Sequence, residues 1–361
     1  MKKVLFYTDT PNIGGAEKHM LLLAKYLSKK GVQVSLAYGK YSKLSRMHHE
    51  FEKYCQNIYV LNALHKHDPR HYLELRKVLS ADSFDLVHLH LWNPGSCRYA
   101  FFAAESAHVP IITTEHDPFE LSGMKKLIKK ICLKKTRCTI AVSMDNSRQL
   151  DELYNFAGGS LKVVHNGIEI DSYLDNHDKA ELPVEKGDTV LTCIAELHHR
   201  KGHRYLLEAF KKLQTHMPRL QLMLVGRGPA EAELKEQAAM IPNIHFLGWR
   251  DDIPQILRVS DLLILPSLRE AFGLSVIEAM ASSVLAIATN NGGTADIIQD
   301  GKTGYLVPPA SADALVDKII IALKNPDQKK DIEKTALESV KKNFTAEIMA
   351  DKTLAVYEKI W

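Results

Sequence analysis

The sequence contains few of the features that mark secreted or membrane-spanning proteins. Its five cysteines are widely spaced and form no C-x-x-C pair, and no zinc-binding pattern is present. An odd, scattered set of this kind predicts reduced thiols and a cytoplasmic protein rather than a disulfide framework. No apolar run approaches the length of a transmembrane helix. The N-terminal apolar run breaks at Asp9, which argues against a signal peptide.

The first glycine loop lacks the fingerprint of a dinucleotide site. Residues 4–7 predict a strand and residues 16–29 predict a helix, but no G-x-G-x-x-G motif lies between them. This absence disfavours a nicotinamide-dependent dehydrogenase. The loop does contain Gly14 and Gly15, for which a plain glycine turn is the alternative to a ligand-binding loop.

Length and charge divide the chain into two parts. A chain of 361 residues exceeds one ordinary hydrophobic core and predicts two domains. Residues 1–175 contain 24 basic and 18 acidic side chains, a net charge of +6, whereas the remainder contains 23 and 25, a net charge of −2. The excess of positive charge therefore belongs to the first half.

Short apolar runs alternate with helical patterns in both halves. This alternation predicts an α/β protein with a parallel sheet in each half. Residues 168–188 are polar and include Pro183 and Gly187, which is typical of an interdomain linker. Three predicted helices, at about residues 312–324, 328–342 and 346–361, close the chain.

The stretch PSLREAFGLSVIE, residues 266–278, carries the main chemical signal. Glu270 follows a predicted strand directly, and Glu278 lies in the next predicted helix. Ligands of open α/β sheets bind outside the carboxyl ends of strands, and helix-start amides suit a phosphate. Gly273 allows the backbone to approach a ligand closely. Two carboxylates around an anion site fit a sugar nucleotide, which offers hydroxyls at both ends of a diphosphate. The alternative is a loop acid and an exposed helix acid.

In its context, PS-x-x-E-A-F-G-L-x-x-x-E-A-M-A resembles the donor-binding signature of retaining glycosyltransferases of the GT-B fold, the group 1 family, also called family 4. The resemblance implies two Rossmann-like parallel-sheet domains that face each other across a cleft. Residues 1–170 would bind the acceptor, with the helix at 346–361 packing back on them. Residues 171–345 would bind the nucleotide sugar.

The resemblance also implies roles for individual residues. Glu270 and His116 would position the sugar, Glu278 would bind the ribose, and Lys201 would neutralise the diphosphate. Gly14 and Gly15 are similar to the family's G-G-A-E loop, which faces the donor. The residues expected to bind the donor are Gly14, Gly15, Arg200, Arg250, Phe272, Gly273, Leu274 and Glu278.

Two positions depart from the family pattern. The expected G-R-L-x-x-x-K-G reads A-E-L-H-H-R-K-G, so Glu196 occupies the place of a phosphate-binding arginine. Arg200 is offset in sequence and is the candidate to replace it. The expected G-G-x-x-E ends in Asp296, one methylene shorter.

Three histidines draw attention as candidates for metal binding or catalysis. His88 and His90 lie two residues apart on a predicted strand, so they share one face. No third ligand is evident and the family uses no essential metal, so we expect no metal site. We expect His90 on the acceptor side, with a structural histidine as the alternative. His116 follows the strand at 110–114, where active-site residues gather.

The most basic segment, GMKKLIKKICLKKTR, begins at Gly123 and ends at Arg137. Its apolar residues recur at helical spacing among lysines, which is typical of a helix on an anionic membrane surface. The alternative is a helix that packs its apolar stripe on the sheet and leaves its lysines solvated. Nucleic acid is a weaker candidate, because no aromatic residues interleave.

The sequence therefore predicts a metal-independent, retaining glycosyltransferase that moves a sugar from a UDP-sugar to a glycan or polyprenyl-linked saccharide. We expect it to act in the synthesis of cell-surface polysaccharide or glycolipid, on the inner face of the plasma membrane. The alternatives are a sugar-nucleotide epimerase of the same fold and, because of Glu196, a non-catalytic partner subunit.

Overall fold

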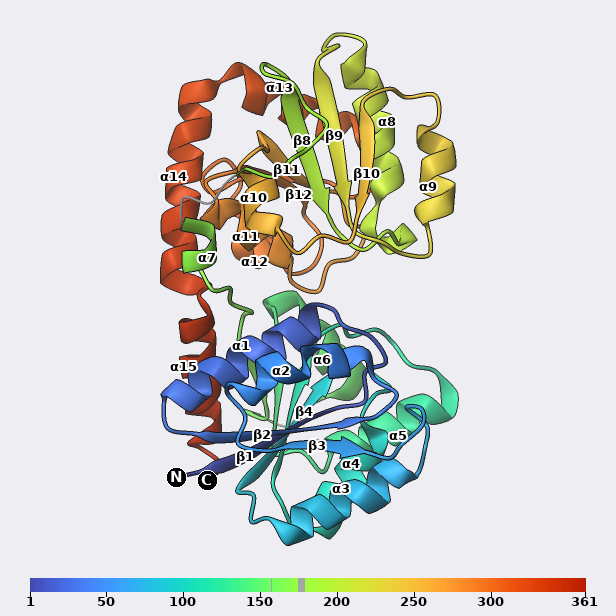
Figure 1. Ribbon diagram of the computed structural model, residues 1–361, viewed down its shortest axis with the longest axis vertical. Coiled ribbons are helices and arrows are strands. Elements are labelled where there is room, and N and C mark those ends of the chain that lie inside the picture. The colour runs from blue at the N-terminus through green and yellow to red at the C-terminus, as the bar shows by residue number, and fades with distance from the viewer. Residues whose placement is uncertain (157, 175–178) are drawn as a thin grey trace. The chain divides into compact units, whose positions relative to one another are not determined.

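The computed structural model describes residues 1–156, 158–174 and 179–361 (Figure 1). The chain forms two compact units. The first contains Met1–Gly167 together with Ala346–Trp361, and the second contains Ile168–Thr345. Residues 175–178, part of the predicted linker, lie outside the described residues. The predicted linker also contains a helix, α7 (Asp171–Leu174), which packs against α11 (Leu274–Ala281) of the second unit.

The first unit is built on a parallel sheet of seven strands in the order β3-β2-β1-β4-β5-β6-β7. Apolar side chains alternate on the inner strands, so each face has its own core. The strands are β1 (Lys3–Thr8), β2 (Gln33–Gly39), β3 (Ile58–Leu61), β4 (Leu86–Leu91), β5 (Ile111–Glu115), β6 (Cys138–Ala141) and β7 (Leu161–Val163).

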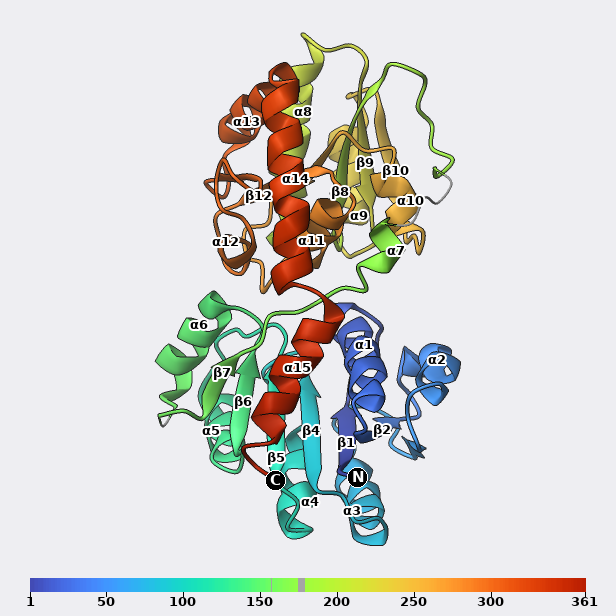
Figure 2. The same cartoon turned by 90° about the vertical axis from the view of Figure 1, so that its left-hand side faces the viewer.

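Helices cover both faces of this sheet. On one face lie α1 (Gly15–Lys29) and α15 (Ala346–Tyr357), which pack together (Figures 1 and 2). On the other face lie α3 (Arg70–Ala81) and α4 (Arg98–Ser106), followed by α5 (Gly123–Leu133). The remaining helices of the unit are η1 (Lys43–Met47), α2 (His48–Glu52) and α6 (Met144–Tyr154).

A buried hydrogen-bond chain ties α15 to the sheet. Nδ1 of His88 on β4 lies 2.6 Å from the hydroxyl of Tyr357, and its Nε2 lies 2.7 Å from the hydroxyl of Thr114. All three side chains are buried. The end of the chain is thus part of the core of the first unit.

The second unit contains a parallel sheet of six strands in the order β10-β9-β8-β11-β12-β13. The predicted parallel sheets of both halves are therefore confirmed. The strands are β8 (Thr189–Ile194), β9 (Leu220–Val225), β10 (Ile244–Gly248), β11 (Leu262–Leu265), β12 (Leu285–Thr289) and β13 (Tyr305–Val307).

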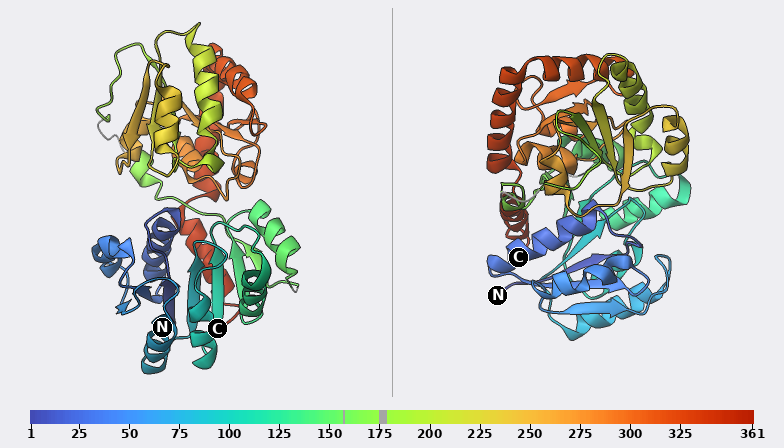
Figure 3. Two further views of the ribbon diagram at one scale, coloured as in Figure 1. Left: turned by 90° about the vertical axis from the view of Figure 1, so that its right-hand side faces the viewer. Right: turned by 45° about the horizontal axis from the view of Figure 1, so that its top comes forward.

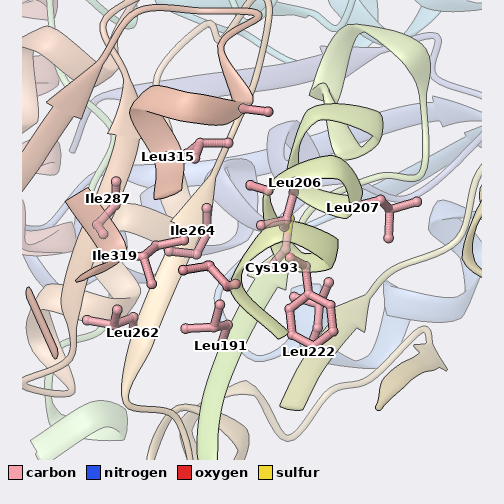
Figure 4. Close-up of a cluster of buried hydrophobic side chains, with 14 of the residues drawn as sticks. Leu191, Cys193, Leu206, Leu207, Leu222, Leu262, Ile264, Ile287, Leu315 and Ile319 are labelled. Atoms are coloured by element: carbon pink, nitrogen blue, oxygen red, sulfur yellow. The ribbon is translucent and has the colours of Figure 1, made fainter. Parts of the chain in front are cut away.

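The core of the second unit lies between this sheet and its helices. Figure 3 shows α8 (His203–Gln214) running along the sheet, and α13 (Ala312–Lys324) packs against α8. In Figure 4, Leu191 and Ile264 from the strands face Leu206 and Ile319 from these helices. The other helices are η2 (His199–Lys201), α9 (Glu231–Ala238), α10 (Ile253–Leu257), α11, α12 (Thr294–Ile297) and α14 (Pro326–Asn343).

The cysteines and the helices bear on two expectations from the composition. All five cysteines are buried and free. Within the residues that the structure describes, every helix is too short or too polar to cross a bilayer.

Candidate active site

A buried ion pair marks the carboxyl end of β11 in the second unit. Nζ of Lys201, at the end of η2, lies 2.6 Å from Oε2 of Glu270 in the loop after β11. Their side chains are only 12% and 10% exposed. The hydroxyl of Ser267 donates a second hydrogen bond to the same carboxylate oxygen, at 2.9 Å. The structure thus brings together two of the three residues predicted to be catalytic.

Glycines allow the loops around this pair to approach one another. Gly202 has φ +68°, and a Cβ atom there would lie 2.0 Å from the carbonyl oxygen of Pro266. A Cβ atom on Gly292, which has φ +81°, would lie 2.0 Å from the carbonyl oxygen of Glu270. The amide of Gly293 donates to that carbonyl at 3.0 Å. Only glycine fits at 202 and 292, because any side chain would push the loop backbones apart.

The electrostatics of this site keep Glu270 ionised. Burial alone raises the pKa of its carboxyl group, because the charged form loses its hydration. The adjacent ammonium of Lys201 and the hydrogen bonds from Lys201 and Ser267 outweigh this, so the pKa of Glu270 lies below its ordinary value. Glu270 is therefore a carboxylate at neutral pH.

The second predicted acid, Glu278, lies in the middle of α11 and is half-buried. It accepts a hydrogen bond from Tyr173 of α7, and this contact, after burial, raises the pKa of the Tyr173 phenol. Gly273 precedes α11 with φ +108°, and Leu274 is the first residue of that helix. Phe272 is buried with its ring 6.0 Å from that of Phe344. Phe272 thus anchors the loop in the core.

The two predicted donor-binding arginines are paired with nearby acids. Arg200 lies 3.3 Å from Glu196, the residue that departs from the family pattern. Arg250 makes two hydrogen bonds to Asp252, at 2.7 and 2.5 Å. The positive charge of Arg200 also acts on Glu270 and helps to lower the pKa of that carboxyl group. Glu196 therefore occupies the place of the family's phosphate-binding arginine. It also pairs with Arg200, the residue that we expected to take over the role of that arginine.

In the first unit, three histidine rings meet near the carboxyl ends of β4 and β5. Nδ1 of His90 lies 3.4 Å from Nε2 of His116, which follows β5. The ring of His19, on α1, lies 4.8 Å from that of His116 and 5.7 Å from that of His90. One nitrogen from each of the three lies within 4.8 Å of the others. The sequence showed no third ligand for the pair His88 and His90, and the structure instead groups His90 with His19 and His116.

Burial governs the charge of these three histidines. It lowers the pKa of His19 to about 4, opposed by the neighbouring Asn166 side chain. Burial and the proximity of the other rings also lower the pKa values of His90 and His116 well below the ordinary value. His90 is fully buried, while His116 remains partly exposed. The three rings are neutral at pH 7.

The predicted donor loop of the first unit starts α1. Gly14 is its N-cap and Gly15 its first residue. The amide of Gly14 donates to the carboxylate of Glu17 at 2.7 Å, so the acid of the G-G-A-E motif closes the start of the helix. Glu17 is buried, and burial raises its pKa. The described contact of Glu17 is therefore a structural one.

The basic segment forms α5, and its apolar residues divide between solvent and the core of the first unit. Met124, Leu127 and Ile131 are 69%, 52% and 42% exposed, whereas Ile128 packs against the core cluster. Lys129 is buried and forms an ion pair with Glu115 at the end of β5. The prediction that Lys129 is one of the surface lysines is wrong.

Sequence reasoning missed three residues that the structure places at these sites. Ser267 stands within the quoted PS-x-x-E motif, so its position next to the carboxylate was available from the pattern. Tyr173 lies in the predicted linker, where we expected no helix, and contacts Glu278. His19 lies on α1, and the residues around it in the sequence do not indicate that its ring lies beside β4 and the loop after β5.

Two family models together match most of the chain. The model described as Glycosyltransferase Family 4 matches residues 13–172, and the model described as Glycosyl transferases group 1 matches residues 175–339. The chain belongs to the group 1 (family 4) glycosyltransferases. The predicted family and GT-B fold are confirmed.

Relatives of this glycosyltransferase match it along its whole length. N-acetyl-alpha-D-glucosaminyl L-malate synthase of Bacillus anthracis is 26% identical, with 100% of this chain and 97% of that protein covered. Phosphatidyl-myo-inositol mannosyltransferase of Mycobacterium leprae is 27% identical, with 98% and 94% covered. The structure of Anabaena HepE in complex with UDP and glucose has a TM-score of 0.83 and 20% identity, with 99% and 100% covered. This structural similarity shows that the two proteins share a fold.

Proposed function

We propose that this glycosyltransferase moves a sugar, with retention of anomeric configuration and without a divalent metal, from a UDP-sugar to a glycan or lipid-linked saccharide. The buried Lys201–Glu270 pair carries the proposal. It lies at the carboxyl end of β11, where ligands of parallel sheets bind. A buried ammonium ion near a helix start provides the counter-charge that a diphosphate requires.

The pair suggests how donor binding would prepare the site. The diphosphate would compete with Glu270 for the ammonium of Lys201, as both are anions. Glu270, still bonded to Ser267, could then accept a hydrogen bond from a sugar hydroxyl. As the anomeric C–O bond to phosphate breaks, the acceptor oxygen would bond to the same face. The leaving phosphate oxygen would take the acceptor proton, stabilised by Lys201. We assign His116 to positioning the sugar.

The choice of UDP rests on similar proteins. HepE has been crystallised with UDP and glucose, and its fold matches this one closely. A thermal-shift panel of UDP-, GDP- and ADP-sugars tests the choice. A ligand at a hundred times its dissociation constant stabilises its protein by about 2.7 kcal/mol. We expect that shift with a UDP-sugar. A shift with only a GDP- or ADP-sugar would overturn the assignment of the base.

An activity assay tests the reaction class. We expect release of UDP above the background of Glu270→Ala, and a product whose anomeric configuration, by NMR, equals that of the donor. Conversion of the nucleotide sugar into its epimer without acceptor would instead identify an epimerase. Binding without turnover would identify the partner subunit that Glu196 suggested.

The surface of α5 favours an acceptor presented at a membrane. Three exposed apolar side chains, those of Met124, Leu127 and Ile131, stand beside lysines on this helix. Such a helix can insert its apolar side chains at the interface while each lysine near an anionic surface contributes about 1 kcal/mol. One relative is named for a phospholipid acceptor, the mannosyltransferase of phosphatidyl-myo-inositol.

Vesicle co-sedimentation tests this surface. We expect binding to anionic but not to neutral vesicles, weakened by high salt and by changing to glutamate two exposed lysines of α5, Lys125 and Lys130, and the exposed Lys134 that follows the helix. A matched control changes three exposed lysines of α14, namely Lys330, Lys334 and Lys342, to glutamate and should still bind. Absence of binding at low salt, or equal loss in both variants, would favour a soluble acceptor.

A further inference from the structure

The three histidines of the first unit form an arrangement that its proposed catalysis does not use. His19, His90 and His116 come from α1, β4 and the loop after β5, so three separate segments converge on one point. Their nearest nitrogens all lie within 4.8 Å of one another. Three imidazoles from different elements, supported by a packed sheet, are the ligand set of many transition-metal sites.

The state of the ring nitrogens also points to a ligand. Among the described residues, neither ring nitrogen of His19 meets the geometry of a hydrogen bond, although the Asn166 side chain lies beside the ring. The His19 side chain is only 4% exposed. Buried polar atoms are nearly always satisfied in native proteins, and exceptions call for an explanation such as an ion. A neutral imidazole has the free electron pair that a metal ion binds.

We propose that His19, His90 and His116 bind one transition-metal ion of the Zn²⁺ class. Nδ1 of His90 and Nε2 of His116 are 3.4 Å apart, which is about the separation of two nitrogens around a tetrahedral zinc ion with bonds of roughly 2.0–2.1 Å. A rotation of the His19 ring would complete the set. His116 is partly exposed, so the fourth position remains open to water. Imidazole without oxygen ligands selects Zn²⁺, Co²⁺, Ni²⁺ or Cu²⁺ over Mg²⁺.

The site is inhibitory, and this part of the inference rests on the proposed function. There, His116 positions the sugar through its ring. A metal ion bound to that ring occupies the nitrogen and fixes the ring towards His19 and His90. Sugar transfer without added metal and inhibition by Zn²⁺ are therefore compatible.

Metal titration tests the binding itself, independently of activity. Cobalt(II) is the probe, because tetrahedral Co²⁺ absorbs visible light. We expect one equivalent to bind the wild-type chain with this absorption. His19→Gln should weaken binding at least about tenfold, because loss of even an outer-shell partner of a metal ligand costs 10–100-fold. The matched control is the double variant His65→Gln/His67→Gln, which removes two neighbouring histidines outside the cluster and should bind as the wild type does.

Three results would overturn the binding site: no cobalt spectrum in the wild type, equal affinity in His19→Gln, or loss of binding in the control. If His19→Gln does not fold by circular dichroism, X-ray absorption of the zinc-loaded wild type decides. Three imidazoles in the metal shell support the site, and fewer than two exclude it.

Activity then tests the inhibition separately. With rates normalised to each protein in EDTA, Zn²⁺ at one equivalent should reduce turnover by the wild type and the control, but not by His19→Gln. Zinc binding without inhibition would refute the role of His116 in the proposed function while leaving the metal site intact. Inhibition that is equal in all three proteins would place the inhibitory ion elsewhere and overturn the inhibitory role.

Discussion

The ammonium group of Lys201 and the carboxylate of Glu270 lie 2.6 Å apart, although 69 residues separate them in the sequence. Removing one partner of a buried ion pair leaves an uncompensated charge. We therefore expect Lys201→Met to lower the free energy of unfolding of the second unit by about 3–5 kcal/mol at pH 7. Urea denaturation measures it. The double variant Lys201→Met/Glu270→Gln is the control and should regain most of that loss, and failure to do so would contradict the assignment.

The same pair predicts the sign of a pH dependence. In the wild type the pKa of Glu270 is lowered, so its contribution to stability is present above the unfolded value of about 4.3 and is lost as pH falls through the folded value. In Lys201→Met burial acts without the counter-charge and raises the pKa of Glu270. The stability difference between the two proteins should therefore shrink from pH 7 to about pH 4. An equal difference at both pH values would disprove the electrostatic origin.

Glu278→Ala should weaken the binding of free UDP as well as of a UDP-sugar, because we assign this carboxylate to the ribose. Loss of a hydrogen bond to a charged group costs roughly 1.5–3 kcal/mol, or about 10- to 150-fold in affinity. Isothermal titration calorimetry measures it. Glu338→Ala, at an exposed glutamate of α14, is the control. Unchanged affinity for UDP would exclude the ribose role.

Lys129→Met should destabilise the first unit, whereas the neighbouring Lys130→Met should not. Lys129 is buried against Glu115, and burial already raises the pKa of that carboxyl group while Lys129 opposes the shift. We expect a loss of about 3–5 kcal/mol for Lys129→Met and less than about 0.5 kcal/mol for the exposed Lys130. Thermal unfolding distinguishes them. Similar melting temperatures would mean that the ion pair contributes little.

Sugar transfer should persist in EDTA, because the proposed mechanism uses Lys201 rather than a divalent ion as counter-charge. Initial rates of UDP release before and after dialysis against EDTA measure this. Full loss of turnover, restored by Mg²⁺ or Mn²⁺, would overturn the proposal. Zn²⁺ is not a suitable ion for the restoration, because the histidine cluster is proposed to bind it.

The sequence predicted the features that depend on local pattern. Strand periodicity gave both parallel sheets, and the near-continuous motif around Glu270 placed that residue at the end of β11. Features that depend on the meeting of distant segments were not predictable. His19 joins His90 and His116 only because α1 covers the sheet beside β4 and β5. Likewise, helical spacing predicted that the lysines of α5 lie on one helix, but it did not predict that Lys129 is buried.

The return of the chain to its first unit has a consequence for biosynthesis. The hydrogen bond between His88 and Tyr357 can form only after Tyr357, 269 residues further along the chain, has been synthesised. At about 5–20 residues per second, translation takes roughly 15–50 seconds to cover that distance. During this interval the apolar sheet face that α15 covers stays open on the ribosome, whereas the second unit is contiguous in sequence. The first unit can therefore be completed only after the whole of the second unit has been synthesised.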